Sequence, residues 1–179
     1  MSQRGLEALL RPKSIAVIGA SEKPERAGSV MMRNLLAGGF AGPILPVTPN
    51  SRSVQGVFAY PSIDKLPITP DLAIICTHHH RNLPCLEQLG QLGCKTVIIL
   101  SSPKPQFPEL KQCCLRYSIR LLGPNSLGLL APWQGLNASF SPIPILKGKL
   151  AFISQSAQSQ TRFLTGRNIG ESDFPTLSR

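Results

Sequence analysis

The residues best suited to chemistry lie in a short turn near the start of the chain. Gly19, Ala20 and Ser21 directly follow the apolar run 15–18 and precede a helical pattern. A turn that joins a buried strand to a helix leaves backbone N–H groups unpaired, and the positive end of the helix dipole points to the same place. Both features stabilise a phosphate group. The sequence therefore predicts a phosphate-binding turn for a nucleotide-type ligand.

The loop after this turn argues against a nicotinamide dehydrogenase. Gly28 is the next glycine after Gly19, so the pattern Gly-x-Gly-x-x-Gly is absent, and the loop contains Lys23 and Arg26. The run at 48–50, expected to end the second strand, supplies no carboxylate for a ribose hydroxyl. These features favour a ligand with more negative charge, such as coenzyme A (CoA). An NAD(P)-dependent oxidoreductase remains an alternative.

Short apolar runs alternate with amphipathic stretches along the chain. Strands are predicted at residues 15–18, 43–47, 56–60 (an edge strand), 71–76, 95–100, 120–123 and 149–154, and helices from near 25 to glycines 38 and 39, over 83–92 and over 110–117. Fully apolar strands separated by helices form parallel sheets that are covered on both faces. The expected fold class is α/β: a Rossmann-like, doubly wound, mainly parallel sheet with helices on both faces.

In such a sheet, ligands bind at the carboxyl ends of the strands. The polar residues that follow the predicted strands are therefore candidates for ligand contact. Besides the first turn, these are Thr48, Pro49, Asn50, Thr77, His78, Ser101 and Ser102.

No catalytic or metal centre is predicted. Three histidines are consecutive at 78–80, but side chains on an extended loop point alternately apart, and no fourth ligand stands at a useful spacing. One of the three contacting the ligand is the favoured interpretation. The chain has no Gly-x-Ser-x-Gly elbow. Its five cysteines include no Cys-x-x-Cys pair, which favours free thiols over a zinc site or disulfides.

The composition of the chain limits the kinds of partner that it is expected to bind. The formal net charge is +10, but the cations are scattered and only 6% of the residues are aromatic, which disfavours nucleic acid. With 42% hydrophobic and 16% charged residues, the chain is typical of a globular protein. No apolar run reaches membrane-spanning length, and the N-terminus is a poor signal peptide. We expect a cytoplasmic protein that binds neither nucleic acid nor membrane.

Four segments in order, at 15–21, 33–40, 120–128 and 147–157, resemble the CoA-binding domain of NDP-forming acyl-CoA synthetases, relatives of the succinyl-CoA synthetase α subunit. The segment 133–140 is similar to the enterobacterial protein lysine acetyltransferases, which join a synthetase-like region to a C-terminal GNAT domain. The resemblance implies CoA or acetyl-CoA as the cofactor. In full-length relatives it also implies ligase-like and GNAT domains beside the CoA-binding domain.

The resemblance also implies roles for individual residues. The first turn would receive a CoA phosphate, with the loop from Pro24 to Gly28 completing the site, and residues 48–50 would lie beside the nucleotide. Thr77, His78, Ser101 and Ser102 would flank the adenosine or the pantetheine. Pro124 and Asn125 match the loop near the thiol end, although Gly, Pro and Asn also form plain turns.

Three parts are expected along the chain. Residues 1–145 are the CoA-binding domain, 146–157 the first strand of a truncated ligase-like domain, and 158–179 a polar tail interrupted by Gly166 and Gly170. We expect this tail to be disordered, the product of a truncation or a frame shift, because it can bury little apolar area. The chain should bind its ligand without catalysis. A redox-sensing or interaction domain of the same fold is the third possibility.

Overall fold

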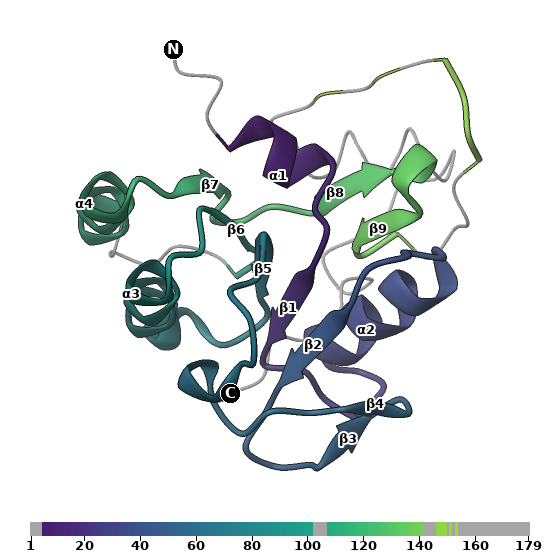
Figure 1. Cartoon of the computed structure of the whole chain (residues 1–179), viewed down its shortest axis with the longest axis horizontal. Helices are drawn as coiled ribbons and strands as arrows, with labels where there is room; N and C mark the ends of the chain where they lie inside the picture. Colours follow the sequence, from purple (N-terminus) through teal and green to yellow (C-terminus); the bar gives the residue numbers. More distant parts are fainter. Residues whose placement is uncertain (1–4, 102–106, 142–145, 150, 152, 154–179) are drawn as a thin grey trace.

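A computed structural model describes residues 5–101, 107–141, 146–149, 151 and 153. Its centre is a parallel five-stranded sheet with the order β2-β1-β5-β6-β7 (Figure 1). The strands are β1 (Ile15–Ile18), β2 (Ile44–Val47), β5 (Leu72–Ile75), β6 (Thr96–Ile99) and β7 (Arg120–Leu122). All five were predicted. The fully buried strands β1, β5 and β6 show the mainly apolar runs of a covered parallel sheet, whereas the residues of the edge strand β7 are half-buried.

Helices cover both faces of this sheet. They are α1 (Leu6–Leu10), α2 (Ala27–Ala37), α3 (Asn82–Leu92) and α4 (Phe107–Tyr117), with single 3₁₀ turns η1 (Ile63–Lys65), η2 (His79–Arg81) and η3 (Pro132–Gln134). Figure 1 shows α3 and α4 on one side of the sheet and α2 on the other. Ile15 and Val17 belong to the core beneath α2, whereas Ala16 and Ile18 belong to the core beneath α3 and α4. The doubly wound architecture is therefore confirmed.

Glycine ends two helices as predicted. Gly39 follows α2 with φ +76°, and Gly93 ends α3 with φ +93°. Both angles lie in the left-handed region that L side chains rarely adopt, so glycine stops each helix at low conformational cost.

Two antiparallel hairpins accompany the sheet: β3 (Ser53–Val54) with β4 (Val57–Phe58), and β8 (Gly128–Ala131) with β9 (Leu136–Ser139). The predicted edge strand at 56–60 is wrong in its extent. Gln55 and Gly56 both have positive φ, at 50° and 82°, and form a two-residue turn that folds β4 back on β3. Only Tyr60 reaches the large sheet, as an isolated bridge to Val47.

The remaining predictions concern the cysteines, membrane-spanning helices and the C-terminal segments. All five cysteines are free, and four of them are buried, as expected. Among the helices of the described residues, none combines the length and the apolar character needed to cross a bilayer. The predicted strand at 149–154 is untested, because residues 149, 151 and 153 are the only ones of it that the structure describes. The tail at 158–179 lies outside the described residues.

Candidate functional site

The carboxyl ends of the parallel strands converge at one edge of the sheet. Ile18 is in register with Val47 of β2 and with Ile75 of β5, and Ile75 is in register with Ile99 of β6. The residues that follow these strands therefore lie together, and we call this set the ligand edge: residues 19–21, 48–50, 77–78, 101 and 124–125. The strand β1 lies between β2 and β5, where the winding of the sheet reverses, which is the usual binding crevice of such folds.

The first turn does not offer the amides that the sequence predicted. The backbone N–H groups of Gly19 and Ala20 both donate to the carbonyl oxygen of Val47, at 2.9 and 3.2 Å. Both N–H groups are therefore already paired, and they join the end of β1 to β2. The hydroxyl of Ser21 accepts a hydrogen bond from the N–H of Lys23 at 3.1 Å, so it shapes the loop.

The donors for an anion lie one step further along, at the start of α2. The N–H groups of Ser29 and Val30 donate to the carbonyl of Arg26. The N–H groups of Ala27 and Gly28 are the first two of the helix, and within the described residues they donate to no acceptor. Two unpaired amides at the positive end of a helix form an anion site. The phosphate-binding role thus fits the start of α2 better than Gly19 and Ala20.

Two glycines allow α2 to approach the first turn closely. Gly19 has φ +87°, and a Cβ atom there would lie 2.7 Å from Cγ2 of Thr77. A Cβ atom on Gly28 would overlap the carbonyl oxygen of Gly19. Both positions therefore need glycine for packing, independently of any ligand. The packing also brings Thr77 directly against the first turn.

The loop between the turn and α2 is held by a residue that the sequence analysis missed. Gln55, in the β3–β4 turn, donates its N–H to Oε1 of Glu22 at 2.8 Å. Its side-chain amide donates to the carbonyl oxygen of Ser29 at 2.9 Å and to the hydroxyl at 3.1 Å. The small hairpin therefore fixes both the loop and the first turn of α2. The Gln-Gly pair between two apolar residues was the only sequence signal for this hairpin.

Two basic side chains, Lys23 and Arg26, lie in the loop before α2. Lys23 is exposed and Arg26 is half-buried. Within the described residues, the one ion pair joins Lys65 to Asp64, so neither loop cation is paired with a carboxylate. Glu22 and Glu25 of the same loop equal the two cations in number, and the carboxylate of Glu22 accepts a hydrogen bond from the N–H of Gln55. Lys23 and Arg26 thus lie in the loop that leads directly to the amides of Ala27 and Gly28.

Poorly satisfied polar atoms gather at the end of β5. Thr77 Oγ1 and His78 Nδ1 are buried. Within the described part of the chain His78 Nδ1 has no hydrogen-bond partner, and Thr77 Oγ1 has only the thiol of Cys85, a weak partner. Leaving a buried polar atom unpaired costs about 1–3 kcal/mol. Such atoms rarely persist unless a ligand or water satisfies them. Both atoms belong to residues that the sequence predicted as ligand contacts.

Ser101 has a structural role. Its hydroxyl exchanges hydrogen bonds with the side-chain amide of Asn82, at 2.9 and 3.1 Å, and both residues are almost fully buried. Its carbonyl accepts the N–H of Asn125 at 2.9 Å. Ser101 therefore joins β6 to the start of α3 and to the loop of Pro124 and Asn125. Ser102 lies outside the described residues.

The turn after β2 forms the rim of the ligand edge. Thr48 is buried, and its Oγ1 accepts a hydrogen bond from the N–H of Asn50 at 3.4 Å. Pro49 and Asn50 are exposed. The exposed pair is available to a ligand, whereas the Thr48 side chain holds the turn.

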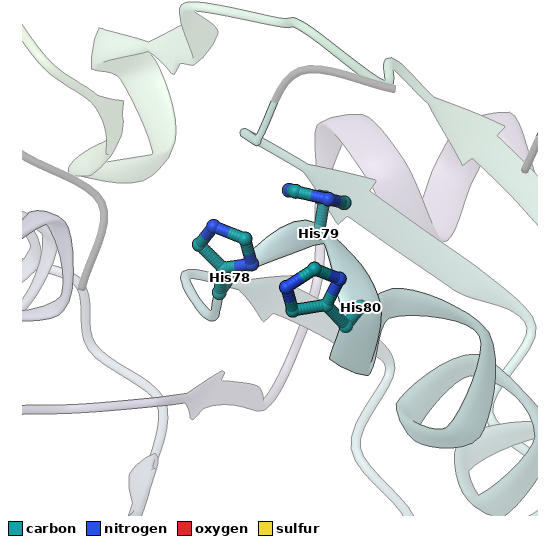
Figure 2. Close-up of side chains that lie close together, drawn as sticks. All are labelled: His78, His79 and His80. Atoms are coloured by element: carbon teal, nitrogen blue, oxygen red, sulfur yellow. The ribbon is translucent and has the colours of Figure 1, made fainter. Parts of the chain in front are cut away.

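The three histidines converge, contrary to the sequence-based prediction. Figure 2 shows the rings of His78, His79 and His80 close together, with centroids 4.0–4.2 Å apart. The prediction assumed an extended loop, but residues 79–81 form a 3₁₀ turn. Such a turn advances only about 2 Å per residue, against about 3.3 Å in a strand, so neighbouring side chains stay near each other.

The thiols near the ligand edge are poor nucleophiles. Burial raises the pKa of the Cys76 thiol well above its ordinary value, and burial also raises the pKa of Cys85. The thiolate is the reactive form of cysteine, so raising the pKa suppresses covalent chemistry at both positions. The arrangement is suited to binding an anionic ligand.

A doubly wound sheet whose second helix begins beside the carboxyl end of the first strand is typical of nucleotide-type ligand-binding domains. The comparison with protein families is more specific. Residues 13–132 match the family described as "CoA binding domain", so the chain belongs to the CoA-binding domain family.

Curated relatives and solved structures agree with this assignment. The chain is 38% identical over 163 residues to the α subunit of acetate–CoA ligase [ADP-forming] I of Pyrococcus furiosus, covering 84% of this chain and 35% of that protein. It is 34% identical over 159 residues to acetate–CoA ligase [ADP-forming] I of Archaeoglobus fulgidus, covering 84% of this chain and 23% of that protein. The dinucleotide-forming acetyl-coenzyme A synthetase 1 of Ca. Korarchaeum cryptofilum superposes with a TM-score of 0.84 at 34% identity, covering 89% of this chain and 36% of that chain. The chain thus spans about a quarter to a third of these proteins' length.

Proposed function

We propose that the chain binds CoA or acetyl-CoA at the ligand edge. The phosphates would lie at the amides of Ala27 and Gly28, with Lys23 and Arg26 of the preceding loop as the cations that attract them. The observation that carries the proposal is a pair of buried polar atoms at the same edge: His78 Nδ1, which is unpaired within the described residues, and Thr77 Oγ1, which has only the weak partner Cys85. The adenosine or the pantetheine would supply their missing hydrogen bonds.

The chain would act as the CoA-binding part of an acyl-CoA synthetase-like protein, and more narrowly of a protein lysine acetyltransferase. The narrower assignment depends on the resemblance of residues 133–140. By itself, the 179-residue chain would bind without turnover, with residues 1–145 as the binding unit. Incubation of the purified chain with acetyl-CoA and a lysine peptide should give no acetyl-lysine by mass spectrometry. Acetylation above the uncatalysed rate would contradict this part.

Calorimetric titration with CoA and with dephospho-CoA tests the binding proposal. Arg26→Ala should weaken CoA binding by about tenfold or more, since a hydrogen bond to a charged group contributes about 1.5–3 kcal/mol. Lys111→Ala, on the exposed side of α4, makes the same change in net charge and should leave CoA binding unchanged.

A parallel titration with NADH separates the alternatives. Binding of CoA but not NADH supports the proposal, and binding of NADH but not CoA favours an oxidoreductase domain. Binding of neither would favour an interaction domain of the same fold. Equal losses from Arg26→Ala and Lys111→Ala would show that only the overall charge attracts CoA, and the phosphate assignment would then be wrong.

A further inference from the structure

The histidine cluster provides three nitrogen ligands in a small volume. One ligand nitrogen from each of His78, His79 and His80 lies within 4.8 Å of the others (Figure 2). Ligand nitrogens of a tetrahedral zinc ion lie about 3.3 Å apart, given Zn–N bonds of about 2.0–2.1 Å. His80 is exposed, so rotation of its side chain can bring its ring nitrogen closer to those of the other two.

A second observation at the cluster also indicates a ligand. His78 Nδ1 is buried and unpaired within the described residues. In neutral imidazole one ring nitrogen carries a lone pair, which a metal ion can use. Coordination is therefore one way to satisfy a buried nitrogen that the fold itself leaves without a partner.

The donor set selects the class of metal. The cluster holds three imidazoles and no carboxylate or thiol. Imidazole ligands suit Zn²⁺, Ni²⁺ and Cu²⁺, whereas Mg²⁺ and Ca²⁺ prefer oxygen. Arg81 follows the cluster and opposes a cation, but its side chain is exposed, so solvent and salt screen the repulsion. Three protein ligands leave a fourth tetrahedral position open to water or to another ligand.

We infer that His78, His79 and His80 together bind one divalent transition-metal ion, with Zn²⁺ as the ion to test first. The site is distinct from the phosphate site at α2, and its existence does not require CoA to bind. It shares only His78 with the ligand edge. The metal should therefore bind in the absence of CoA.

The composition of the chain makes this inference easy to test. The three histidines of the cluster are the only ones in the 179 residues, so an untagged chain has no other imidazole. Zn²⁺ is titrated into the full chain in a CoA-free, non-chelating buffer, with a chromophoric chelator as competitor. We expect one ion per chain. A chain that does not compete with the chelator overturns the inference.

Two variants separate imidazole from thiol binding. The double variant His79→Asn, His80→Asn keeps His78 and should lose at least about tenfold in Zn²⁺ affinity for each imidazole removed. Cys114→Ser removes the one cysteine that is not fully buried and should bind Zn²⁺ as the wild type does. Unchanged affinity in the double variant, or loss of binding in Cys114→Ser, contradicts the inference.

CoA titration of the double variant tests whether the variant is folded and whether the two sites are independent. His79 and His80 are not among the proposed CoA contacts, so CoA should bind this variant normally, which also shows that it is folded. Loss of Zn²⁺ binding with retained CoA binding supports the metal site. If the wild type binds Zn²⁺ but not CoA, the proposed function fails while the metal site stands.

Discussion

At the scale of single residues, burial makes Cys94 a source of pH-dependent stability. The side chain is fully buried, its thiol donates to the carbonyl of Thr96 at 3.4 Å, and burial raises its pKa from 9.0 to about 11. The unfolded chain loses this proton near pH 9, whereas the folded chain keeps it until about pH 11. Between these values the folded state binds more protons, so the free energy of unfolding falls as the pH rises.

We therefore expect Cys94→Ala to weaken the alkaline loss of stability. A shift of this size corresponds to about 2–3 kcal/mol by pH 11. Urea unfolding at pH 8, 9, 10 and 11 measures it. The small cavity left by alanine lowers stability at every pH equally, so only the slope reports the thiol. Parallel curves for the variant and the wild type would show that Cys94 does not titrate differently in the two states.

Which residues lie at the ligand edge could be predicted from the sequence, but not what each one does there. Thr77, His78 and Asn125 lie at the carboxyl edge because the strands before them could be identified. Two residues that support the edge, Gln55 and Asn82, were missed. Gln55 lies in a turn that was not predicted and contacts Glu22, and Asn82 contacts Ser101, which is distant in sequence. The hydrogen bond from the N–H of Gly19 to the carbonyl of Val47 depends on the register in which β1 pairs with β2, and no local sequence pattern reveals that register.

At the scale of elements, the approach of α2 to β1 decides where the proposed phosphate site lies. Gly28 lies in the first turn of α2 against the backbone of Gly19 and Ala20. Gly28→Ala would place a methyl group 2.9 Å from the carbonyl carbon of Gly19 and 3.0 Å from Cα of Ala20. These atoms are backbone and cannot rotate away, so the helix must move.

Gly28→Ala should lower the free energy of unfolding by about 1–3 kcal/mol, the usual cost of overpacking. It should also weaken CoA binding, because the moved helix no longer presents its amides correctly. Urea unfolding and calorimetry measure the two effects. The control is Gly148→Ala, where an added Cβ atom meets no other atom of the described chain within 4 Å. An unchanged stability of Gly28→Ala would refute the close approach of α2.

The central elements could be predicted better than the peripheral ones. Strands such as β5 and β6 are apolar on both faces, which leaves one interpretation. The hairpin β8–β9 was missed because β8 carries no alternation of apolar and polar residues, and the alternation in β9 spans only four residues. In β8 all four residues are half-buried, while β9 has three buried residues out of four. These strands depend on packing against α2, and tertiary contacts of this kind leave a weak local signal.

At the scale of the whole molecule, α2 is held between the sheet and the β8–β9 hairpin. Leu136 and Ala138 of β9 belong to the same apolar core as Met31 and Leu35 of α2. Asn34 adds a polar link, since its buried amide donates to the carbonyls of Ser139 at 2.7 Å and Ser141 at 3.1 Å. The hairpin therefore fixes the outer side of the helix whose first turn is the proposed phosphate site.

We expect Asn34→Ala to loosen the hairpin without unfolding the sheet. Two carbonyls lose their donor, which should lower the free energy of unfolding by about 1–3 kcal/mol. Amide hydrogen exchange should quicken in β9, while β1 and β5 keep their protection, because their hydrogen bonds lie within the five-stranded sheet. The neighbouring Arg33 is exposed on α2, so Arg33→Ala serves as the control and should change neither quantity. Equal loss of protection in β9 and β1 would mean that hairpin and sheet unfold as one unit, and α2 would then owe its position to the sheet as much as to the hairpin.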